Sequence, residues 1–483
     1  MFTLIISIVI LISGYMFYGR FIVKFFGENP NSVTPAININ DNVDFIPLPT
    51  WKVFVIQFLN IAGLGPIFGA ILGAMYGPAS YIWIVLGCIF MGAVHDYFSG
   101  MISLRNGGIS LPEMVGKYLG NGIKNFLRIF TLLLLIFVGV AFVTGPAGLL
   151  NNFSGGGKIY WVIGIFIYYL LATLLPINKI IGKVYPFFGI ALLLMAVMVF
   201  GYMLLHGFTD SNFTLNELSF DQLKNLHSNP SQNILYPMMF IVLSCGAISG
   251  FHSTQSPMMA RCLKNEKNGR MAFYGAMIAE GIVALIWATA AMNYFGDTLA
   301  LNDAMTPKEH DPAWVVNEIC QTWFGKSGAI MAIIGVIVLP ITTGDTAFRS
   351  ARLTVSDMFK VEQKNILKRL YISIPIFIIG IILSQLDFKT IWKYLGLSNQ
   401  ILACIVLWTS AAYLVKSGKT HWLLSIPAMF LTAVCTTYFI VAPYKNGGLE
   451  LNPQTGNIIG IIMSIIVFIV FYFFIIQKQK KEV

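Results

Sequence analysis

Several ionisable side chains lie inside segments that are otherwise apolar. His95 and Asp96 belong to the segment 79–104, and Glu280 belongs to 271–299. Such groups are costly to bury unless they are paired or functional, and carboxyl and imidazole groups can carry protons. We interpret His95, Asp96 and Glu280 as candidates for a proton relay. Neighbouring helical residues point about 100° apart, so we do not expect His95 and Asp96 to pair simply with each other.

Two further apolar segments are interrupted by glycine, proline and polar residues. The segment 51–77 is interrupted at 60–66, and the segment 234–261 at 244–257. Such interruptions free carbonyl groups that can coordinate a cation and N–H groups that can bind an anion. His252 could bind a substrate carboxylate or relay a proton. The alternatives are a packing kink and a histidine satisfied by a backbone carbonyl. We interpret these residues as candidates for substrate binding: Asn60, Gly63, Gly65, Ser249, His252, Ser253 and Gln255.

A polar stretch near residue 340 offers oxygen ligands of the kind that suits a small cation. It contains Thr342, Thr343 and Asp345, and hydroxyl and carboxylate oxygens are hard ligands. Together with the freed carbonyl groups around Ala62, these residues form our candidate ion-coupling site. Asp345 and Arg349 have the i,i+4 spacing of a helical salt bridge, so a structural ion pair is the alternative role of Asp345.

The composition identifies an integral membrane protein. The chain of 483 residues is 57% hydrophobic and only 11% charged, whereas soluble domains carry about 25% charged residues. The net charge of +10 does not indicate nucleic-acid binding, because the positive charges lie at the ends of apolar segments, where they orient a membrane chain. The six cysteines lack CxxC spacing, and GxxxxGK[ST] and HExxH motifs are absent. We therefore expect no metal site, no cofactor and no ATP-driven pump.

Windows of about 20 apolar residues predict about thirteen membrane-spanning helices. If the N-terminus is outside, most of the 31 lysines and arginines lie at cytoplasmic ends, as the positive-inside rule requires. The C-terminus is then cytoplasmic. The outside loop 300–326 is expected to contain an amphipathic surface helix at 313–324. The predicted spans are 2–26, 51–76, 79–104, 125–150, 159–176, 184–206, 234–261, 271–299, 327–350, 370–386, 391–415, 420–441 and 457–476.

The two interrupted segments begin two sets of five spans, at 51–206 and 234–415. Because five is odd, the two sets enter the membrane from opposite sides, which is the inverted repeat of many transporters. An extra helix at 1–26 precedes the sets, and two helices with a cytoplasmic tail at 420–483 follow them. We predict an all-α polytopic membrane protein that forms a single transmembrane domain, 1–483, with about thirteen transmembrane helices and a 5+5 inverted repeat.

Four short motifs resemble those of one known family. They lie at 60–70, 92–97, 103–108 and 345–352, the last reading Asp-Thr-Ala-Phe-Arg-Ser-Ala-Arg. They are similar to motifs of the carbon starvation protein A family, including its Asp-Thr-x-x-Arg-x-x-Arg signature. The resemblance implies an inner-membrane transporter of peptides or pyruvate, induced on carbon limitation. It also implies the amino acid–polyamine–organocation superfamily, with a leucine-transporter-like core.

These observations together predict a secondary active transporter and not an enzyme. It would import a small-molecule substrate, peptide or pyruvate, across the bacterial inner membrane with H⁺ or Na⁺. The lipid bilayer is its expected partner, and nucleic acid is not. The alternatives are a sodium-coupled amino-acid transporter, a polytopic membrane enzyme that uses His95, Asp96 or His252, and a channel or nutrient sensor. An enzyme would need a nucleophile or metal set at one depth, and the sequence shows none clearly.

Overall fold

The structure is a computed structural model that describes residues 1–154, 156–174, 185–210, 213, 216–307, 310–333, 335, 337, 339–363, 365–385 and 388–479. These residues form helices and loops, with a single isolated bridge between Leu48 and Leu263. A bilayer offers no water to pair exposed backbone groups, so a chain this apolar must satisfy them within helices. The helices are α1 (Phe2–Ser13), α2 (Gly19–Phe26), α3 (Pro35–Asn38), α4 (Thr50–Ala62), α5 (Ala70–Ala74), α6 (Ala79–Gly87), α7 (Ala93–Arg105), α8 (Leu111–Leu119), α9 (Asn121–Ser154), α10 (Lys158–Leu174), α11 (Tyr185–Thr209), α12 (Phe240–Val242), α13 (Ser244–Ala247), α14 (His252–Ala260), α15 (Ala276–Tyr294), α16 (Thr298–Ala304), α17 (Pro312–Ile333), α18 (Leu339–Phe359), α19 (Ile366–Leu383), α20 (Phe388–Lys416), α21 (Trp422–Val441) and α22 (Pro453–Phe471).

Short π-helical turns join several of these helices into longer rods. Such turns are rare and often occur at functional sites. The turn at Cys88–Gly92 joins α6 to α7 just before His95, and the turn at Gly65–Gly69 follows the first interruption. Further π-helical turns among the described residues lie at Gly14–Tyr18, Leu235–Met239, Arg270–Gly275 and Tyr472–Gln477.

Nine helices among the described residues are long and apolar enough to cross a bilayer, and the bent pair α4–α5 brings the number up to ten. These ten correspond to ten of the predicted spans. Of the other three, α10 is a shorter apolar helix, 234–261 is divided into short helices, and 327–350 includes residues outside those described. The count of thirteen and the inverted repeat therefore stay predictions. Part of the short turn expected at 386–388 also lies outside the described residues.

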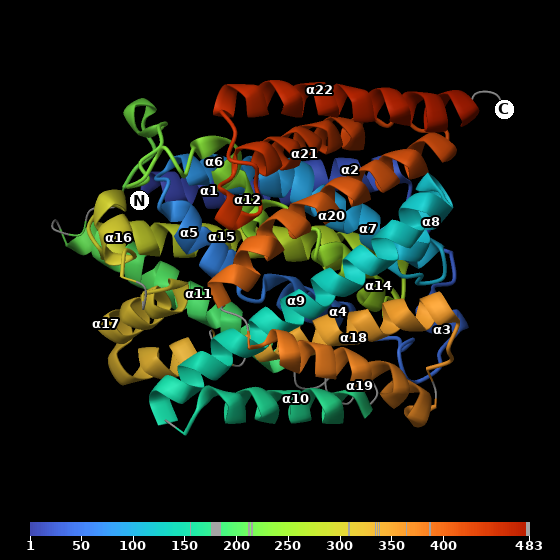
Figure 1. Ribbon diagram of the computed structural model, residues 1–483, viewed down its shortest axis with the longest axis horizontal. Coiled ribbons are helices and arrows are strands. Elements are labelled where there is room, and N and C mark those ends of the chain that lie inside the picture. The colour runs from blue at the N-terminus through green and yellow to red at the C-terminus, as the bar shows by residue number, and fades with distance from the viewer. Residues whose placement is uncertain are drawn as a thin grey trace.

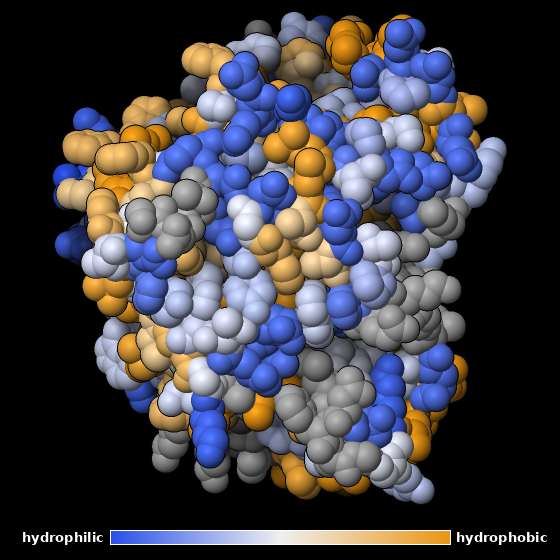
Figure 2. All heavy atoms as spheres, turned by 90° about the vertical axis from the view of Figure 1, so that its left-hand side faces the viewer, coloured by the Kyte–Doolittle hydropathy of each residue, from blue (hydrophilic) through white to orange (hydrophobic). Residues whose placement is uncertain are grey.

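The helices run mainly along one direction between two ends of the molecule (Figure 1). One end carries α16 and α17, and the opposite end carries α3 and α8. Hydrophilic residues cover much of the α16/α17 end (Figure 2), which the charge bias predicts to be the outside. Along the flank, α22 exposes Ile458, Ile462 and Ile466. An exposed apolar flank between polar ends is the surface that a bilayer covers.

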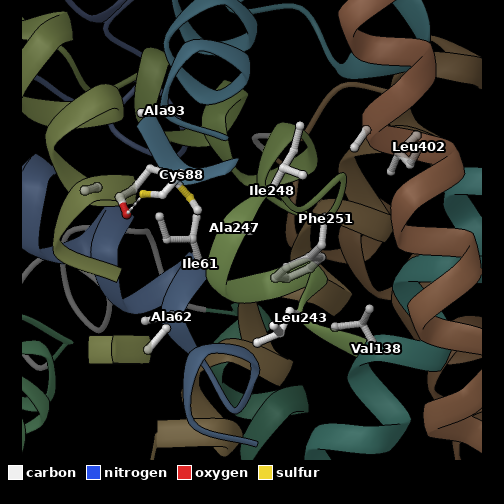
Figure 3. Packing of buried hydrophobic residues seen from close by; sticks show 14 of the residues in the cluster. Ile61, Ala62, Cys88, Ala93, Val138, Leu243, Ala247, Ile248, Phe251 and Leu402 are labelled. Atoms are coloured by element: carbon white, nitrogen blue, oxygen red, sulfur yellow. Dashed lines mark hydrogen bonds between the residues drawn. The ribbon is translucent and has the colours of Figure 1, made fainter. Parts of the chain in front are cut away.

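The centre of the bundle is formed by the two interrupted segments and by α15. Almost every residue of α15 is buried, including Glu280. In Figure 3, Ile61 from the first interrupted segment lies beside Ala247 from the second, and α13 packs against the turn at Gly65–Gly69. The interruptions are thus placed together in the core, where lipid does not reach their irregular backbone.

The surface helix predicted at 313–324 is confirmed as a helix and forms the first part of α17. The helix continues to Ile333 but contains a kink at Gly325, whose φ of +56° and ψ of −135° are non-helical. Only glycine adopts this conformation readily.

Candidate functional site

The first interruption bends the chain by 51° between α4 and α5. Gly63 ends α4 with φ +27° and ψ −133°, a conformation that other residues rarely adopt. Pro66 lies in the first turn of the next segment, where its missing N–H is tolerated. Asn60 is fully buried one turn earlier, and its Oδ1 and Nδ2 have no hydrogen-bond partner among the described residues. A buried amide that protein groups leave unsatisfied is what a ligand-binding residue presents.

The second interruption separates α13 from α14, and the side chain of Asn399 of α20 makes hydrogen bonds to it. Ile248 has an extended backbone, with φ −159° and ψ 129°. The Oδ1 atom of Asn399 accepts a hydrogen bond from the backbone N–H of Phe251 at 2.7 Å, and its Nδ2 lies 2.9 Å from Oγ of Ser249. Asn399 also lies 3.3 Å from the hydroxyl of Ser244. One amide side chain thus replaces the hydrogen bonds that a continuous helix would have made.

The two interruptions meet at a pair of small residues. A Cβ atom added to Gly65 would lie 2.3 Å from Cβ of Cys245. On the other side of the second segment, a Cβ added to Gly246 would lie 2.9 Å from Cβ of Ala284, one turn from Glu280. The second segment is therefore packed tightly between the first interruption and α15.

A cavity of about 360 Å³ extends from loops at the α16/α17 end down to both interruptions. Gly65, Cys245 and Asn399 line its inner part, and His310 and Asp311 line its outer part. Its walls are mainly apolar and include Phe68, Val138, Phe142 and Phe251. A few convergent polar groups in a mainly apolar pocket are typical of small-molecule sites.

Of the seven residues predicted to bind substrate, the cavity lining includes Gly65. Ser253 and Gln255 lie on α14 and are engaged elsewhere: the hydroxyl of Ser253 donates to the carbonyl of Gly250 at 2.6 Å, and Nε2 of Gln255 donates to Thr254 at 2.8 Å. Sequence analysis missed Asn399, although an asparagine within the apolar span 391–415 is a signal of a functional polar residue.

Four ionisable side chains from three helices form a buried chain. Nδ1 of His95 lies 2.8 Å from Oδ1 of Asp96, and Nδ1 of His252 lies 2.9 Å from Oδ2 of the same carboxylate. Nε2 of His252 lies 3.4 Å from Oε2 of Glu280. All four side chains are fully buried. The order Glu280–His252–Asp96–His95 alternates carboxyl and imidazole groups, which is an arrangement that can pass a proton.

The expectation that His95 and Asp96 do not pair is wrong. Their backbone positions diverge around α7, but the Asp96 carboxylate has two oxygens and receives one imidazole on each. The sequence argument considered helix angles alone and left out the reach of the side chains. His252, for which the sequence left substrate binding and proton relay both open, contacts the side chains of Asp96 and Glu280.

The candidate ion-coupling residues are divided between two faces of α18. The hydroxyl of Thr343 donates to the carbonyl of Leu59 at 3.2 Å, beside the first interruption. A Cβ added to Gly63 would lie 3.2 Å from Cγ2 of Thr343. Two residues further along the helix, about 200° around it, Asp345 is buried and interacts with Tyr169 of α10. Thr343 thus adjoins the first interruption, and Asp345 lies away from it.

The bundle is closed at the α3/α8 end, below the interruptions. Nη2 of Arg352 lies 3.5 Å from Oδ1 of Asp44, just before α4. Nε of Arg261 donates to the carbonyl of Gly108 at 2.8 Å, and the N–H of Leu48 donates to the carbonyl of Cys262. These contacts join the segment before α4 to α18 and to the residues after α14, and join those residues to the loop after α7. The cavity therefore lies toward the α16/α17 end, and these contacts cross the bundle at the other end.

Replacing Asn399 by alanine should lower both stability and substrate affinity. The substitution leaves the buried N–H of Phe251 without its acceptor, which costs about 1–3 kcal/mol. We expect a lower Tm and about tenfold weaker substrate binding, because about 1.4 kcal/mol corresponds to a factor of ten. Scanning fluorimetry and binding titration measure these two effects.

The matched control is Asn293→Ala on α15. Asn293 is also buried and hydrogen-bonded, to Thr289 and Asn216, but it does not line the cavity. The control should lower Tm and leave affinity unchanged. Equal losses of affinity in both variants would contradict the role of Asn399.

Solved structures with the same architecture define the class of this fold. A Na⁺-coupled sialic acid symporter in its outward-open state aligns over 95% of this chain and 96% of its own, with a TM-score of 0.55 and 13% identity. MhsT in complex with L-phenylalanine aligns over 86% of this chain and 97% of its own, with a TM-score of 0.55 and 14% identity. The protein is a multi-pass membrane protein with the fold of these two solved structures, the first of which is a Na⁺-coupled symporter.

The chain belongs to the family of carbon starvation protein CstA, whose family model matches residues 1–217, 147–328 and 313–438. This confirms the resemblance that the short motifs carry. An uncharacterised membrane protein of Haemophilus influenzae is 43% identical over 62% of this chain and 92% of its own length. The peptide transporter CstA of Bacillus subtilis is 26% identical over 99% of this chain and 96% of its own. The pyruvate/proton symporter BtsT of Escherichia coli is 26% identical over 59% of this chain and 48% of its own.

Proposed function

We propose that this protein is a secondary active transporter that imports a small carboxylate-bearing substrate, a peptide or pyruvate, together with protons. The observation that carries proton coupling is the buried chain Glu280–His252–Asp96–His95. Relatives named as a peptide transporter and as a pyruvate/proton symporter support the substrate class. The proposed location is the bacterial inner membrane, with the N-terminus outside.

The buried chain adjoins the substrate cavity through the second interruption. Cys245 lines the cavity and lies near Glu280. A proton that reaches Glu280 can pass to Nε2 of His252 once the 3.4 Å contact between them shortens to a hydrogen bond, while Nδ1 of His252 gives its proton to Asp96. Each step moves a proton between neighbouring groups, without a free ion in the apolar core.

Substrate binding and protonation would act on the same broken helix. His252 is the first residue of α14, and Asn399 fixes the chain just before it. The substrate carboxylate would bind near the two interruptions, where half-helix N-termini and free N–H groups favour an anion. Protonation of Asp96 would weaken its hold on His252 and release α14 for the inward-open state. The two events are thereby coupled through one mobile element.

The decisive experiment is uptake by purified protein in proteoliposomes. Labelled pyruvate and labelled small peptides are offered separately under an imposed proton gradient, an imposed sodium gradient, and neither. We expect saturable accumulation that needs the proton gradient and collapses with a protonophore. Flux that does not saturate and does not depend on either gradient would indicate a channel and would contradict the proposal.

A second candidate, sodium coupling, is favoured by the contact of Thr343 with the first interruption. Carbonyl and hydroxyl oxygens there are suitable sodium ligands. If sodium is the coupling ion, Thr343→Ala should raise the sodium concentration for half-maximal uptake by about tenfold or more, the effect of losing a ligand worth about 1.4 kcal/mol. Asp345→Asn tests the same hypothesis on the other face of α18.

The outcome separates the two ions. Under proton coupling, uptake by the Thr343→Ala protein still depends on the proton gradient and shows no sodium dependence. Normal coupling in the Asp345→Asn protein would remove Asp345 from the candidate ion site.

A further inference from the structure

Three arginines are buried together on the side of α18 that faces away from the substrate cavity. Arg349 and Arg352 lie on α18 and Arg369 lies on α19. Their exposed fractions are 2%, 1% and 3%. A guanidinium group stays charged at any physiological pH, so burying three of them near one another requires compensating negative charge.

The protein supplies only part of that compensation. Asp44 lies 3.5 Å from Arg352, which is longer than a strong charge-assisted hydrogen bond of about 2.7–2.9 Å. Arg349 and Arg369 each donate to a backbone carbonyl near the end of α10, those of Ala172 and Thr173. Carbonyls at a helix C-terminus carry a partial negative charge of about half a unit at most. Even if Asp345 is counted with Asp44, three full positive charges face two carboxylates.

Many of the guanidinium N–H groups also lack acceptors. Nε and Nη1 of both Arg349 and Arg352, and Nε of Arg369, have no hydrogen-bond partner among the described residues. All five nitrogens are buried. An unsatisfied buried donor on a charged group costs more than a neutral one. The two oxygens of one carboxylate are too few to accept hydrogen bonds from all five nitrogens. A phosphate group has more oxygens and a larger negative charge.

We propose that Arg349, Arg352 and Arg369 form a binding site for a phosphate group at the α3/α8 end of the bundle, with Asp44 as a competing internal anion. The phosphate group belongs to an anionic lipid or to free phosphate. The position of α19 at the edge of the bundle favours the lipid. Leu367 and Tyr371 are 64% and 81% exposed, so the face of α19 opposite the buried Arg369 meets the surroundings of the bundle. Basic pockets between membrane helices on the cytoplasmic side are sites where lipid headgroups bind.

The site is separate from the substrate cavity. Ser350, on the opposite face of α18, contacts the carbonyl of Thr254 on α14 at 3.3 Å. Arg349 and Arg352 instead contact α10 and the segment before α4. A bound phosphate group would therefore act on the scaffold that holds α18 and on the closure made by Asp44.

The test measures the thermal stability of the purified protein by scanning fluorimetry. In neutral detergent, low-millimolar phosphate is compared with chloride at equal ionic strength. In nanodiscs, phosphatidylcholine alone is compared with a mixture containing phosphatidylglycerol. We expect phosphate in detergent, phosphatidylglycerol in nanodiscs, or both to raise the Tm of the unaltered protein by about 2–5 °C. A ligand that binds only the folded state stabilises that state. A shift in the nanodisc arm alone identifies the lipid, and a shift in detergent identifies free phosphate.

Three variants make the test specific. Arg352→Gln, or Arg369→Gln if the first does not fold, should lose the shift. Asp44→Asn removes the competing carboxylate and should enlarge the Tm shift. If Asp44 and Arg352 form a purely structural ion pair, the variant instead has a lower Tm and an unchanged Tm shift. Arg128→Gln, at the surface ion pair with Glu113, is the control and should keep it. No shift with either phosphate source, or an equal shift in Arg352→Gln, overturns the proposal.

Discussion

Replacing Asp96 by asparagine should abolish proton-driven accumulation and leave exchange of substrate across the membrane intact. The amide keeps the size of the side chain but cannot take up a proton, and it cannot accept hydrogen bonds from both His95 and His252. We expect uptake under a pH gradient to fall to the level of protein-free liposomes. Counterflow, in which unlabelled internal substrate drives entry of labelled substrate, requires no net proton movement and should persist.

The control for this experiment is Asp303→Asn, because Asp303 is exposed at the end of α16. It should keep proton-driven uptake. A merely structural Asp96 would lose counterflow and accumulation together, along with a large fall in Tm, since breaking a buried ion pair costs about 3–5 kcal/mol. Accumulation that survives in the Asp96→Asn protein would remove this residue from the proton relay.

Replacing Gly65 by alanine should stop transport by forcing the two interruptions apart. The new Cβ would lie 2.3 Å from Cβ and 2.7 Å from Sγ of Cys245. Overpacking of a rigid core costs about 1–3 kcal/mol or more. We expect a lower Tm and loss of both accumulation and counterflow, because the cavity proposed to bind substrate ends at this contact.

The chain offers a matched control and a rescue. Gly164→Ala on α10 introduces the same methyl group where no described atom lies within 4 Å, so it should be tolerated. Adding Cys245→Gly to the Gly65→Ala protein removes the clashing Cβ and should restore Tm and transport in part. Without that rescue, the contact between the two interruptions is not the cause of the defect. The double-mutant comparison isolates the pairwise effect.

The backbone features of this protein could be predicted from its sequence, because they depend on local chemistry. Glycine and proline at 63–66 predicted a broken helix, and the structure contains the 51° bend there. Composition predicted an all-helical membrane protein, and short motifs predicted the family.

The partners of the polar side chains could not be predicted in the same way. His252 lies on α14 and its carboxylate partners on α7 and α15, so their contact depends on how three helices rotate and pack. Asn399 is 148 residues away from the Phe251 N–H that it satisfies. Side-chain contacts over such separations follow from tertiary packing, which periodicity in one segment does not contain.

The near-complete burial of α15 limits which substitutions this helix can tolerate. A membrane helix is inserted because it is hydrophobic, but α15 packs against protein over most of its surface. The space around two of its small residues limits the size of their side chains. A Cβ at Gly281 would lie 2.7 Å from Sγ of Cys88, and Ala284 already abuts Gly246. Larger apolar residues at these two positions would favour insertion and yet disrupt assembly. Membrane insertion therefore favours larger apolar side chains on α15, whereas packing in the folded protein favours smaller ones. The helix that carries Glu280 tolerates only a narrow range of side-chain sizes.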